Sequence, residues 1–514
     1  MRILLISPLV QACNYPGDYY ARWPQLGLAY IASTLEQGGH KVRILEKRLL
    51  SGPRYPDSKK ELDRVNRLML SEIEEFSPYM IGLTATTPVI MDAYRTANII
   101  KSAYPKIPIV IGGRHATSLS IYTLEQCGNI DIVCRGEGEV TMLELAEGLP
   151  WDKIRGITYR KEGGGFSENP SQPLVENLDT LPYPAWHLLD QDFYFQPGIS
   201  MMRGDYMRTV TMMTSRGCPY QCAFCQSPEL LDIYGKGYIR YHSPDRVISE
   251  IEYLMGRFKI TGVSFSDDIF SLHRERVIQI CNKIIERGIN KHLKFIVNLR
   301  SDRVDIELLS VLKKAGCIHV VFGSESGSEV TLKRMNKSLS VNKNIEAVEL
   351  AKRQALTVES NIIIGSPGES ERDFQQTIDF LKKARPDRIF ISKFYPLPGT
   401  GFFKELIDRK IIRRPQDWND LNTLYVETDD FTFADMPAKR FVWLRNKMSR
   451  EIVAWVNFSY VIKNNWHKDI KLSAAQFIKM LAYIFFLYLP ISIQKTMKNI
   501  TEELSIGLRY SLRR

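Results

Sequence analysis

The sequence lacks any apolar run long enough to suggest a membrane span. Its most apolar C-terminal stretch, Met480–Ile493, holds fourteen residues without a charge and contains Pro490. A spanning helix needs about 20 predominantly apolar residues. The apolar run near the start, Ile3–Ile6, is shorter than the core of a signal peptide and has no small-residue cleavage site after it. We therefore expect a cytoplasmic protein.

Cysteine is also scarce, with 8 in 514 residues. So few cysteines do not make a disulfide framework, and in a long chain without a secretion signal a local cluster of them favours metal ligation. Three of them lie within Cys218–Cys225. We expect the remaining thiols at Cys127, Cys134, Cys281 and Cys317 to pack as small apolar side chains.

No excess of charge is concentrated in one segment. The chain has 69 Lys and Arg against 58 Asp and Glu, a formal net charge of +11, and a hydrophobic fraction of 44%. This composition is that of a folded globular protein. A basic surface suits an anionic partner, but the spread of the charges does not choose among nucleic acid, phosphorylated substrate and membrane.

Short apolar runs alternate with helix-length segments over residues 1–160, which predicts a parallel sheet covered on both faces by helices. The expected strands are Ile3–Ile6, Lys41–Leu45, Met80–Leu83, Ile107–Ile111 and Ile130–Val133. The expected helices include Leu26–Gln37, Asp63–Glu75 and Ile90–Ala103. Ligands of doubly wound sheets bind beyond the carboxyl ends of the strands. Small residues and glycines gather there, although tight turns alone would also explain them.

A second strand–helix series follows a Gly- and Pro-rich linker, expected over residues 161–205. Six units over residues 206–406 predict a partial or complete (β/α) barrel, and we expect a partial one of six units. Its expected strands are Thr209–Thr214, Gly262–Phe265, Lys294–Asn298, His319–Phe322, Glu359–Ile364 and Arg388–Ile391. Residues 407–514 are expected to be mainly helical. Within them Met480–Ile493 is expected to form a core helix. In a second interpretation, Phe477–Ile493 forms a helix that lies in a membrane interface.

The most informative segment is the cysteine loop, Gly217–Cys225, directly after an expected strand. Cys218, Cys222 and Cys225 have the spacing C-x3-C-x2-C. Three thiolates can hold a [4Fe–4S] cluster while leaving one iron open, since a closed cluster takes four cysteines. A structural zinc site would need a fourth ligand, and no histidine or cysteine with paired spacing lies nearby.

With this loop the chain resembles the radical S-adenosylmethionine superfamily. The resemblance implies a [4Fe–4S] cluster whose open iron binds S-adenosylmethionine, and reductive cleavage to a 5′-deoxyadenosyl radical. It assigns S-adenosylmethionine contacts, residue by residue, to the position directly before the third cysteine and to positions at the ends of the expected barrel strands. These are Phe224, Asp267, Asp268, Arg300, Glu325 and Gly365.

The first domain resembles the cobalamin-binding domain that precedes the radical domain in one large branch of this superfamily, on the segments Pro24–Ile31, Gly112–Thr117 and Arg135–Glu139. The resemblance implies a Rossmann-like cobalamin domain. The cobalamin contacts it implies are Thr84, Thr86, Gly112, Gly113, His115, Gly136 and Glu137. The loop after the second strand, Glu46–Ser51, carries no histidine. Cobalamin would then bind without a histidine ligand, and a domain that had lost cobalamin would also lack that histidine.

The resemblance implies two main reactions. The first prediction is methylation of an unactivated carbon of a lipid-like or tetrapyrrole-like substrate. The alternative is an oxidative cyclisation or rearrangement, because Ser215–Tyr220 and Pro184–Leu189 are similar to the anaerobic Mg-protoporphyrin monomethyl ester cyclase branch. A non-catalytic corrinoid-binding iron–sulfur protein is an alternative of another class, but a structural cluster needs no S-adenosylmethionine contacts.

Three kinds of partner follow from this interpretation. A flavodoxin or ferredoxin would supply the electron. No nucleic acid is expected, because the C-terminal segment is more apolar than an RNA-binding appendage. Peripheral membrane contact through the C-terminal segment would suit a lipid or tetrapyrrole substrate.

Overall fold

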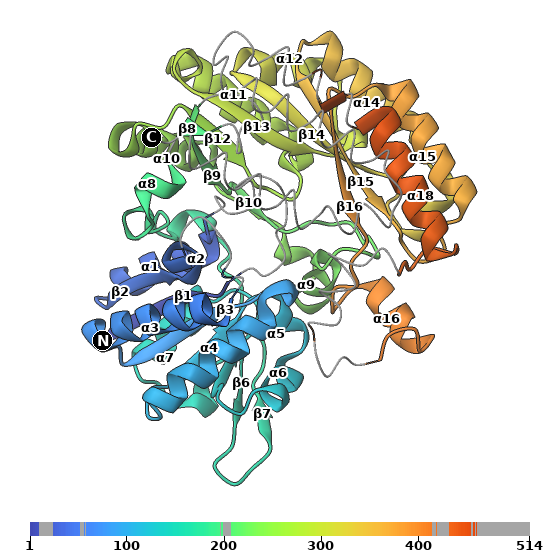
Figure 1. The fold of residues 1–514 in the computed structure, drawn as a ribbon. Helices are drawn as coiled ribbons and strands as arrows, with labels where there is room; N and C mark the ends of the chain where they lie inside the picture. Colours follow the sequence, from blue (N-terminus) through green and yellow to red (C-terminus); the bar gives the residue numbers. More distant parts are fainter. Residues whose placement is uncertain are drawn as a thin grey trace.

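The computed structural model describes residues 1–9, 24–51, 56, 58–195, 197–198, 207–413, 418, 431–453, 456–457 and 459. These residues form two seven-stranded sheets, each flanked by helices. Figure 1 shows the N-terminal sheet, in blue and teal, below the second sheet, in green to orange. The helix that follows the cysteine loop, α9 (Ser227–Tyr234), lies between them.

The N-terminal sheet has the strand order β2-β1-β3-β4-β5-β6-β7. Its strands are β1 (Arg2–Ser7), β2 (Lys41–Glu46), β3 (Met80–Thr84), β4 (Ile109–Gly112), β5 (Ile132–Cys134), β6 (Ile157–Arg160) and β7 (Phe166–Glu168). The first five are parallel and the last two antiparallel. The switch point of the chain between β1 and β3 is where doubly wound sheets bind ligands.

Helices cover both faces of this sheet, as the alternating pattern predicted. They are α1 (Leu26–Gln37), α2 (Lys47–Ser51), α3 (Lys59–Phe76), α4 (Ile90–Ala103), α5 (Arg114–Ser118), α6 (Ser120–Gln126) and α7 (Glu139–Ala146). The α3 helix begins where the Ser58 hydroxyl accepts from the backbone of Glu61, and it buries only one stripe, including Val65 and Met69. The bounds of α1 and α4 coincide with those expected from sequence.

The β6–β7 hairpin did not follow from the sequence. Its turn is made by Gly163–Gly165, and Gly164 and Gly165 adopt positive φ angles of 92° and 75°. We expected these glycines to open the linker at residue 161. They instead form the turn of a hairpin inside the first sheet. A run of glycines is common both in tight hairpin turns and in linkers, so the sequence alone did not distinguish the two.

Where a cobalamin protein can carry a histidine, after β2, this chain has a buried ion pair. Lys47 is fully buried, and its Nζ donates to Asp92 at 2.9 Å and to Thr96 at 2.8 Å. Burial lowers the pKa of Lys47, and Asp92 opposes that shift.

We expect K47M to lower the free energy of unfolding by about 3–5 kcal/mol, because it leaves the Asp92 carboxylate buried without its main cation. Urea unfolding followed by circular dichroism measures this loss. The control is K343M, which removes an exposed pair between Lys343 and Glu346 and should cost less than about 1 kcal/mol. Equal losses in the two variants would contradict the prediction.

The second sheet is the expected partial barrel, with the strand order β16-β15-β14-β13-β12-β9-β8. Its strands are β8 (Pro197–Gly198), β9 (Met207–Met212), β12 (Gly262–Phe265), β13 (Lys294–Leu299), β14 (Cys317–Glu325), β15 (Thr357–Ile364) and β16 (Arg388–Lys393). The six from β9 to β16 are parallel and β8 is antiparallel at one edge. The outer helices are α10 (Pro244–Phe258), α11 (Arg274–Glu286), α12 (Ile306–Lys314), α13 (Glu329–Arg334), α14 (Val341–Arg353) and α15 (Glu371–Ala384).

The expected linker packs against the barrel. Trp186 and Phe195 are fully buried in the same apolar core as the barrel strands. After the barrel, α16 (Gly401–Asp408) and α18 (Ala438–Met448) follow, and α18 lies along α15. Among the described residues, no helix is long and apolar enough to cross a membrane. The segment Phe477–Ile493 lies outside the described residues.

Candidate functional site

The cysteine loop leaves the barrel between β10 (Ser215–Arg216) and α9. Gly217 has a φ of 98°, and a Cβ there would stand 2.6 Å from the backbone oxygen of Tyr238, so only glycine fits. Cys222 is buried, Cys218 and Cys225 are half-buried, and all three thiols are free. The backbone N–H of Ser227 donates to Cys225 Sγ at 3.4 Å.

The three thiols are close enough to influence one another. Burial raises the pKa of Cys218 to about 12, and the charges of Asp268, Cys225 and Cys222 add to this shift. Burial also raises the pKa of Cys222, whereas Lys337 lowers it. A buried thiol with a raised pKa loses its proton and becomes a good ligand when a metal centre supplies positive charge.

Within the described residues, no three acidic, histidine or cysteine side chains converge closely enough to hold a single metal ion. The cysteines of a cubane bind different irons, so they do not converge on one point. The free, mutually close thiols and the backbone donor to Cys225 therefore fit a cluster better than an isolated ion.

The two adjacent aspartates at the end of β12 have different environments. Asp267 is buried and accepts from the backbone N–H groups of Thr214 and Ser215, at 2.6 Å and 2.9 Å, and from the Thr214 hydroxyl at 2.5 Å. Asp268 is exposed, although burial of its surroundings raises its pKa and Arg114 opposes that shift. The carboxylate of Asp267 is thus occupied by hydrogen bonds within the protein, while Asp268 is accessible to a ligand.

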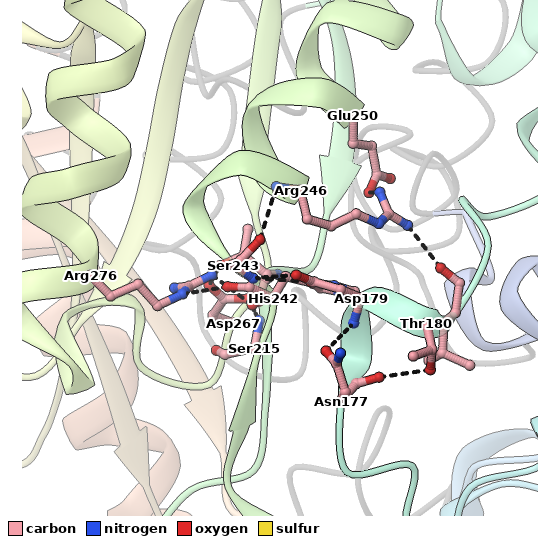
Figure 2. A network of polar contacts seen from close by, with 12 residues as sticks. Asn177, Asp179, Thr180, Ser215, His242, Ser243, Arg246, Glu250, Asp267 and Arg276 are labelled. Atoms are coloured by element: carbon pink, nitrogen blue, oxygen red, sulfur yellow. Dashed lines mark hydrogen bonds and ion pairs between the residues drawn. The ribbon is translucent and has the colours of Figure 1, made fainter.

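The buried acceptor Asp267 belongs to a larger polar network (Figure 2). Arg276 donates to the backbone oxygens of Thr214 and His242, at 2.8 Å and 2.7 Å. The His242 ring in turn meets Asp179, from the linker, at 3.0 Å. Burial lowers the pKa of His242 to about 4. The network fixes the end of β9, from which the cysteine loop starts.

Arg300 and Glu325, both expected to contact S-adenosylmethionine, meet at Lys337. Lys337 Nζ is 2.8 Å from Glu325 Oε1 and 5.7 Å from the centre of the Phe224 ring. Arg300 is buried, donates to the backbone oxygens of Lys337 and Ser338, and stacks over the Tyr220 ring at 3.6 Å.

Lys337 was missed from the sequence, since a lysine in a loop is usually a solvated surface residue. Burial opposes its charge, but Glu325 and Cys222 hold the pKa of Lys337 above its ordinary value. The adjoining backbone is tied to the cysteine loop, because Ala223 N–H donates to the oxygen of Met335 at 2.9 Å. Lys337 therefore places a cation beside Cys222.

Gly365, expected to contact S-adenosylmethionine, has a φ of 81° at the end of β15. A Cβ there would lie 3.1 Å from the ring of Phe441, on α18. The backbone N–H of Gly365 donates to Glu369 at 2.6 Å. Glu369 is fully buried, and burial raises its pKa to about 8.

A raised carboxyl pKa means that the folded state favours the protonated form. The stabilisation from Glu369 is fully present below its ordinary pKa of 4.5 and is lost as the pH rises through about 8. Between these values we expect E369Q to remove a decline in unfolding free energy on the order of a few kcal/mol. Urea titrations at several pH values measure it, with the exposed D379N as control. An unchanged slope in E369Q would contradict this assignment.

The expected cobalamin residues divide into three groups. Thr84, Thr86, Gly112 and Gly113 lie together at the strand ends, where the Ala85 N–H donates to the Gly112 oxygen at 2.9 Å. Thr86 is exposed and both glycines are half-exposed, so this edge of the sheet is accessible and suits a large ligand lying over the backbone.

His115, on α5, is buried inside the protein. Its ring is fully buried, meets the Thr87 hydroxyl at 3.1 Å and stands edge-on to Trp418 with ring centres 4.7 Å apart. Burial lowers the pKa of His115 to about 3. The preceding residue, Arg114, contacts the barrel. Its guanidinium donates to the Tyr238 hydroxyl at 3.3 Å.

Arg114 brings a cation of the first domain to the cysteine loop. Burial opposes its charge, while Tyr238, Asp268 and Cys225 hold the pKa of Arg114 above its ordinary value. Its Nη1 atom is buried and has no hydrogen-bond partner among the described residues. The position beside the glycines of the Gly112–Thr117 segment was the only sequence signal for it.

Gly136 and Glu137 also face the barrel. Gly136 has a φ of 76°, and its Cα lies against the Tyr234 hydroxyl with no room for a side chain. Glu137 pairs with Arg216 and Arg240 of the barrel. Their expected contact with cobalamin stays a prediction.

The fold and these loops define a class of protein in which a doubly wound domain faces a partial barrel carrying three free cysteines. Two family models match: one described as the B12 binding domain, over residues 17–146, and one described as the Radical SAM superfamily, over residues 212–381. The uncharacterized methyltransferase PH0819 of Pyrococcus horikoshii is 32% identical over 428 residues, which are 82% of this chain and 87% of that protein. The chain belongs to the radical SAM family with a B12-binding domain.

Two further relatives agree. The anaerobic magnesium-protoporphyrin IX monomethyl ester cyclase of Rubrivivax gelatinosus is 28% identical over 80% of this chain and 70% of its own length. The radical S-adenosylmethionine methyltransferase TsrM of Kitasatospora setae, solved with cobalamin and a [4Fe–4S] cluster, shares the fold with a TM-score of 0.63. It is 19% identical, and the match covers 79% of this chain and 78% of that one. The chain is thus a radical SAM enzyme, and the expected cofactors are confirmed at the level of the domains that bind them.

Proposed function

We propose that this enzyme holds a [4Fe–4S] cluster on Cys218, Cys222 and Cys225 and uses it, with cobalamin in the first domain, to methylate an unactivated carbon. When bound, the cluster supplies the electron that cleaves S-adenosylmethionine, and cobalamin supplies the methyl group. The residues of this chain bind and orient these groups. The substrate we propose is tetrapyrrole-like or lipid-like.

The observation that carries the proposal is the meeting of the two domains at the cysteine loop. Arg114, from the first domain, lies beside Asp268 and Cys225 of the barrel. Asp268 is exposed, so its carboxylate is accessible to an ammonium group such as that of S-adenosylmethionine. A methyl donor in the first domain would then stand close to the carbon radical formed at the barrel.

The names of the relatives favour methyl transfer first, because PH0819 is named a methyltransferase. They favour oxidative cyclisation second, because the Rubrivivax relative is named a cyclase. A tetrapyrrole-like substrate agrees with the second name.

A flavodoxin or ferredoxin is proposed as the electron donor. Phe477–Ile493 is proposed as a membrane contact. A variant that ends after Leu472 and binds vesicles as well as the full chain would refute the membrane contact.

The test is anaerobic purification and cluster reconstitution, followed by iron, sulfide and corrinoid quantitation. We expect about four irons per chain and one bound corrinoid after addition of hydroxocobalamin. A reduced sample given S-adenosylmethionine and candidate tetrapyrroles should form 5′-deoxyadenosine, S-adenosylhomocysteine and a methylated product. A cluster without corrinoid binding would refute methyl transfer, and 5′-deoxyadenosine without S-adenosylhomocysteine would favour the cyclase reaction.

A further inference from the structure

Two carboxylates of the first domain contact the two arginines that flank the cysteine loop. Arg216, two residues before Cys218, reaches Glu137 at 3.0 Å through Nη1 and Glu139 at 2.6 Å through Nη2. Arg240, on β11 (Arg240–Tyr241), which pairs with β10, contacts both carboxylate oxygens of Glu137. One guanidinium thus bridges two acids, and one acid bridges two guanidinium groups.

These contacts are largely shielded from water. The exposed fractions of the side chains are 10% for Arg216, 5% for Glu139, 7% for Arg240 and 20% for Glu137. The Arg216 guanidinium also lies over the ring of Tyr30, on α1, 5.0 Å from its centre. Two positive and two negative groups balance, so the carboxylates have no charge left over for a cofactor. Burial opposes the charge of Arg216, but Glu139 and Glu137 hold its pKa above the ordinary value.

The chain after the cysteines is also held by the first domain. The Ser118 hydroxyl, at the end of α5, donates to Glu229 on α9. The hydroxyl of Tyr234, at the end of α9, packs against Gly136. The cysteine loop is therefore held at both ends by loops that follow β4 and β5.

We propose that Arg216 is a positioning residue that fixes the geometry of the cysteine loop by docking it onto Glu137 and Glu139. The two carboxylates, in a segment that resembles a cofactor-binding loop, act on the cluster loop and not as ligands of cobalamin. A guanidinium suits this contact better than an ammonium, because its planar fork donates to the two carboxylates in fixed directions, whereas an ammonium contacts them as a point charge. This inference rests on the proposed function for its role, because the loop is taken to hold the cluster.

The first experiment measures the loop itself in the full-length chain before cluster loading. Under anaerobic, reducing conditions, timed iodoacetamide labelling with peptide mass spectrometry gives the alkylation rate of each cysteine. In R216A we expect Cys218 and Cys222 to react about tenfold faster than in wild type, because the loop opens more often. Cys281 and Cys317, buried in the barrel core, report on the fold within the same sample and should stay protected.

The matched control is R274A. Arg274 also pairs with two acids, Asp305 and Glu307, but on the surface of the barrel. It should leave the alkylation rates unchanged. If R216A also exposes Cys281 and Cys317, the E137Q/E139Q double variant, which keeps the shapes of the side chains, replaces it. Unchanged rates at Cys218 and Cys222 in a folded R216A or E137Q/E139Q variant would overturn the inference.

The second experiment separates positioning from a merely structural role. After reconstitution, R216K and E137Q/E139Q should show an altered electron paramagnetic resonance spectrum of the reduced cluster and a weaker change on adding S-adenosylmethionine. Hydroxocobalamin affinity, measured by visible spectroscopy, should stay within about threefold of wild type. Loss of hydroxocobalamin binding with an unchanged cluster spectrum would overturn the inference and restore Glu137 as a cobalamin contact. Failure of wild type to take up a cluster would refute the proposed function alone, because the alkylation rates are measured without it.

Discussion

Replacing Cys222 by alanine is expected to reduce the iron of the reconstituted protein from about four atoms per chain to less than one. Cys222 is the most buried of the three thiols and the one beside the Lys337 cation. Two thiolates cannot hold a cubane against loss of iron, so 5′-deoxyadenosine formation should fall to background. Iron and sulfide analysis and chromatography of the reaction mixture measure both effects.

The control for this variant is C281A. Cys281 is fully buried on α11, and its pKa is raised mainly by burial. Its removal creates a small cavity and lowers stability by about 1 kcal/mol, while iron content should stay at the wild-type level. Loss of iron in C281A, or retention of about four irons in C222A, would show that the cluster lies elsewhere.

Replacing the two adjacent aspartates is expected to separate folding from cofactor binding. D267A removes the acceptor of three hydrogen bonds from Thr214 and Ser215, so we expect a loss of about 3–5 kcal/mol in unfolding free energy and poor cluster loading. D268A changes an exposed side chain, so stability and iron content should stay near wild type. Its affinity for S-adenosylmethionine should fall by about 10- to 100-fold, the worth of one charge-assisted contact.

Thermal unfolding and S-adenosylmethionine titration of the reduced cluster measure the two effects. Each aspartate serves as the control for the other, since they are neighbours of the same type on the same strand end. Weakened binding in D267A with D268A unaffected would reverse the assignment of the two residues.

The alternation of short apolar runs with helix-length segments predicted both sheets, because each strand or helix is recognised from its own residues. Strands such as β12, Gly262–Phe265, are buried throughout, so their apolar runs mark them clearly. The cysteine spacing is equally local, and the position of Asp267 and Asp268 after an expected strand placed them near the loop. Which of the two is open to a ligand depends on Thr214, 53 residues away, and no local pattern contains that information.

Contacts between the domains were the main features that the sequence did not predict. Nothing in either segment indicates that Glu137 pairs with Arg216, and only the folded chain brings them within 3.0 Å. His115 was expected to contact cobalamin, and its own segment does not indicate that its ring packs against Trp418. Lys337 is buried beside Cys222 because Met335 and Asn336 bond to the cysteine loop. Each of these depends on pairing across more than 70 residues.

The apolar core of the first sheet is completed by residues made much later in the chain. The cluster that contains Leu4 and Ile111 also contains Phe394, directly after β16, Phe402 on α16, and Trp418. During synthesis at about 5–20 residues per second, the first sheet would wait about 15–60 s between the emergence of β5 and that of Trp418. Throughout that interval the part of this cluster that Phe394, Phe402 and Trp418 cover lacks its native contacts, so chaperone dependence during translation should concentrate on the N-terminal half. Slowing translation between residues 134 and 418 should therefore reduce the yield of soluble protein more than slowing it before β5.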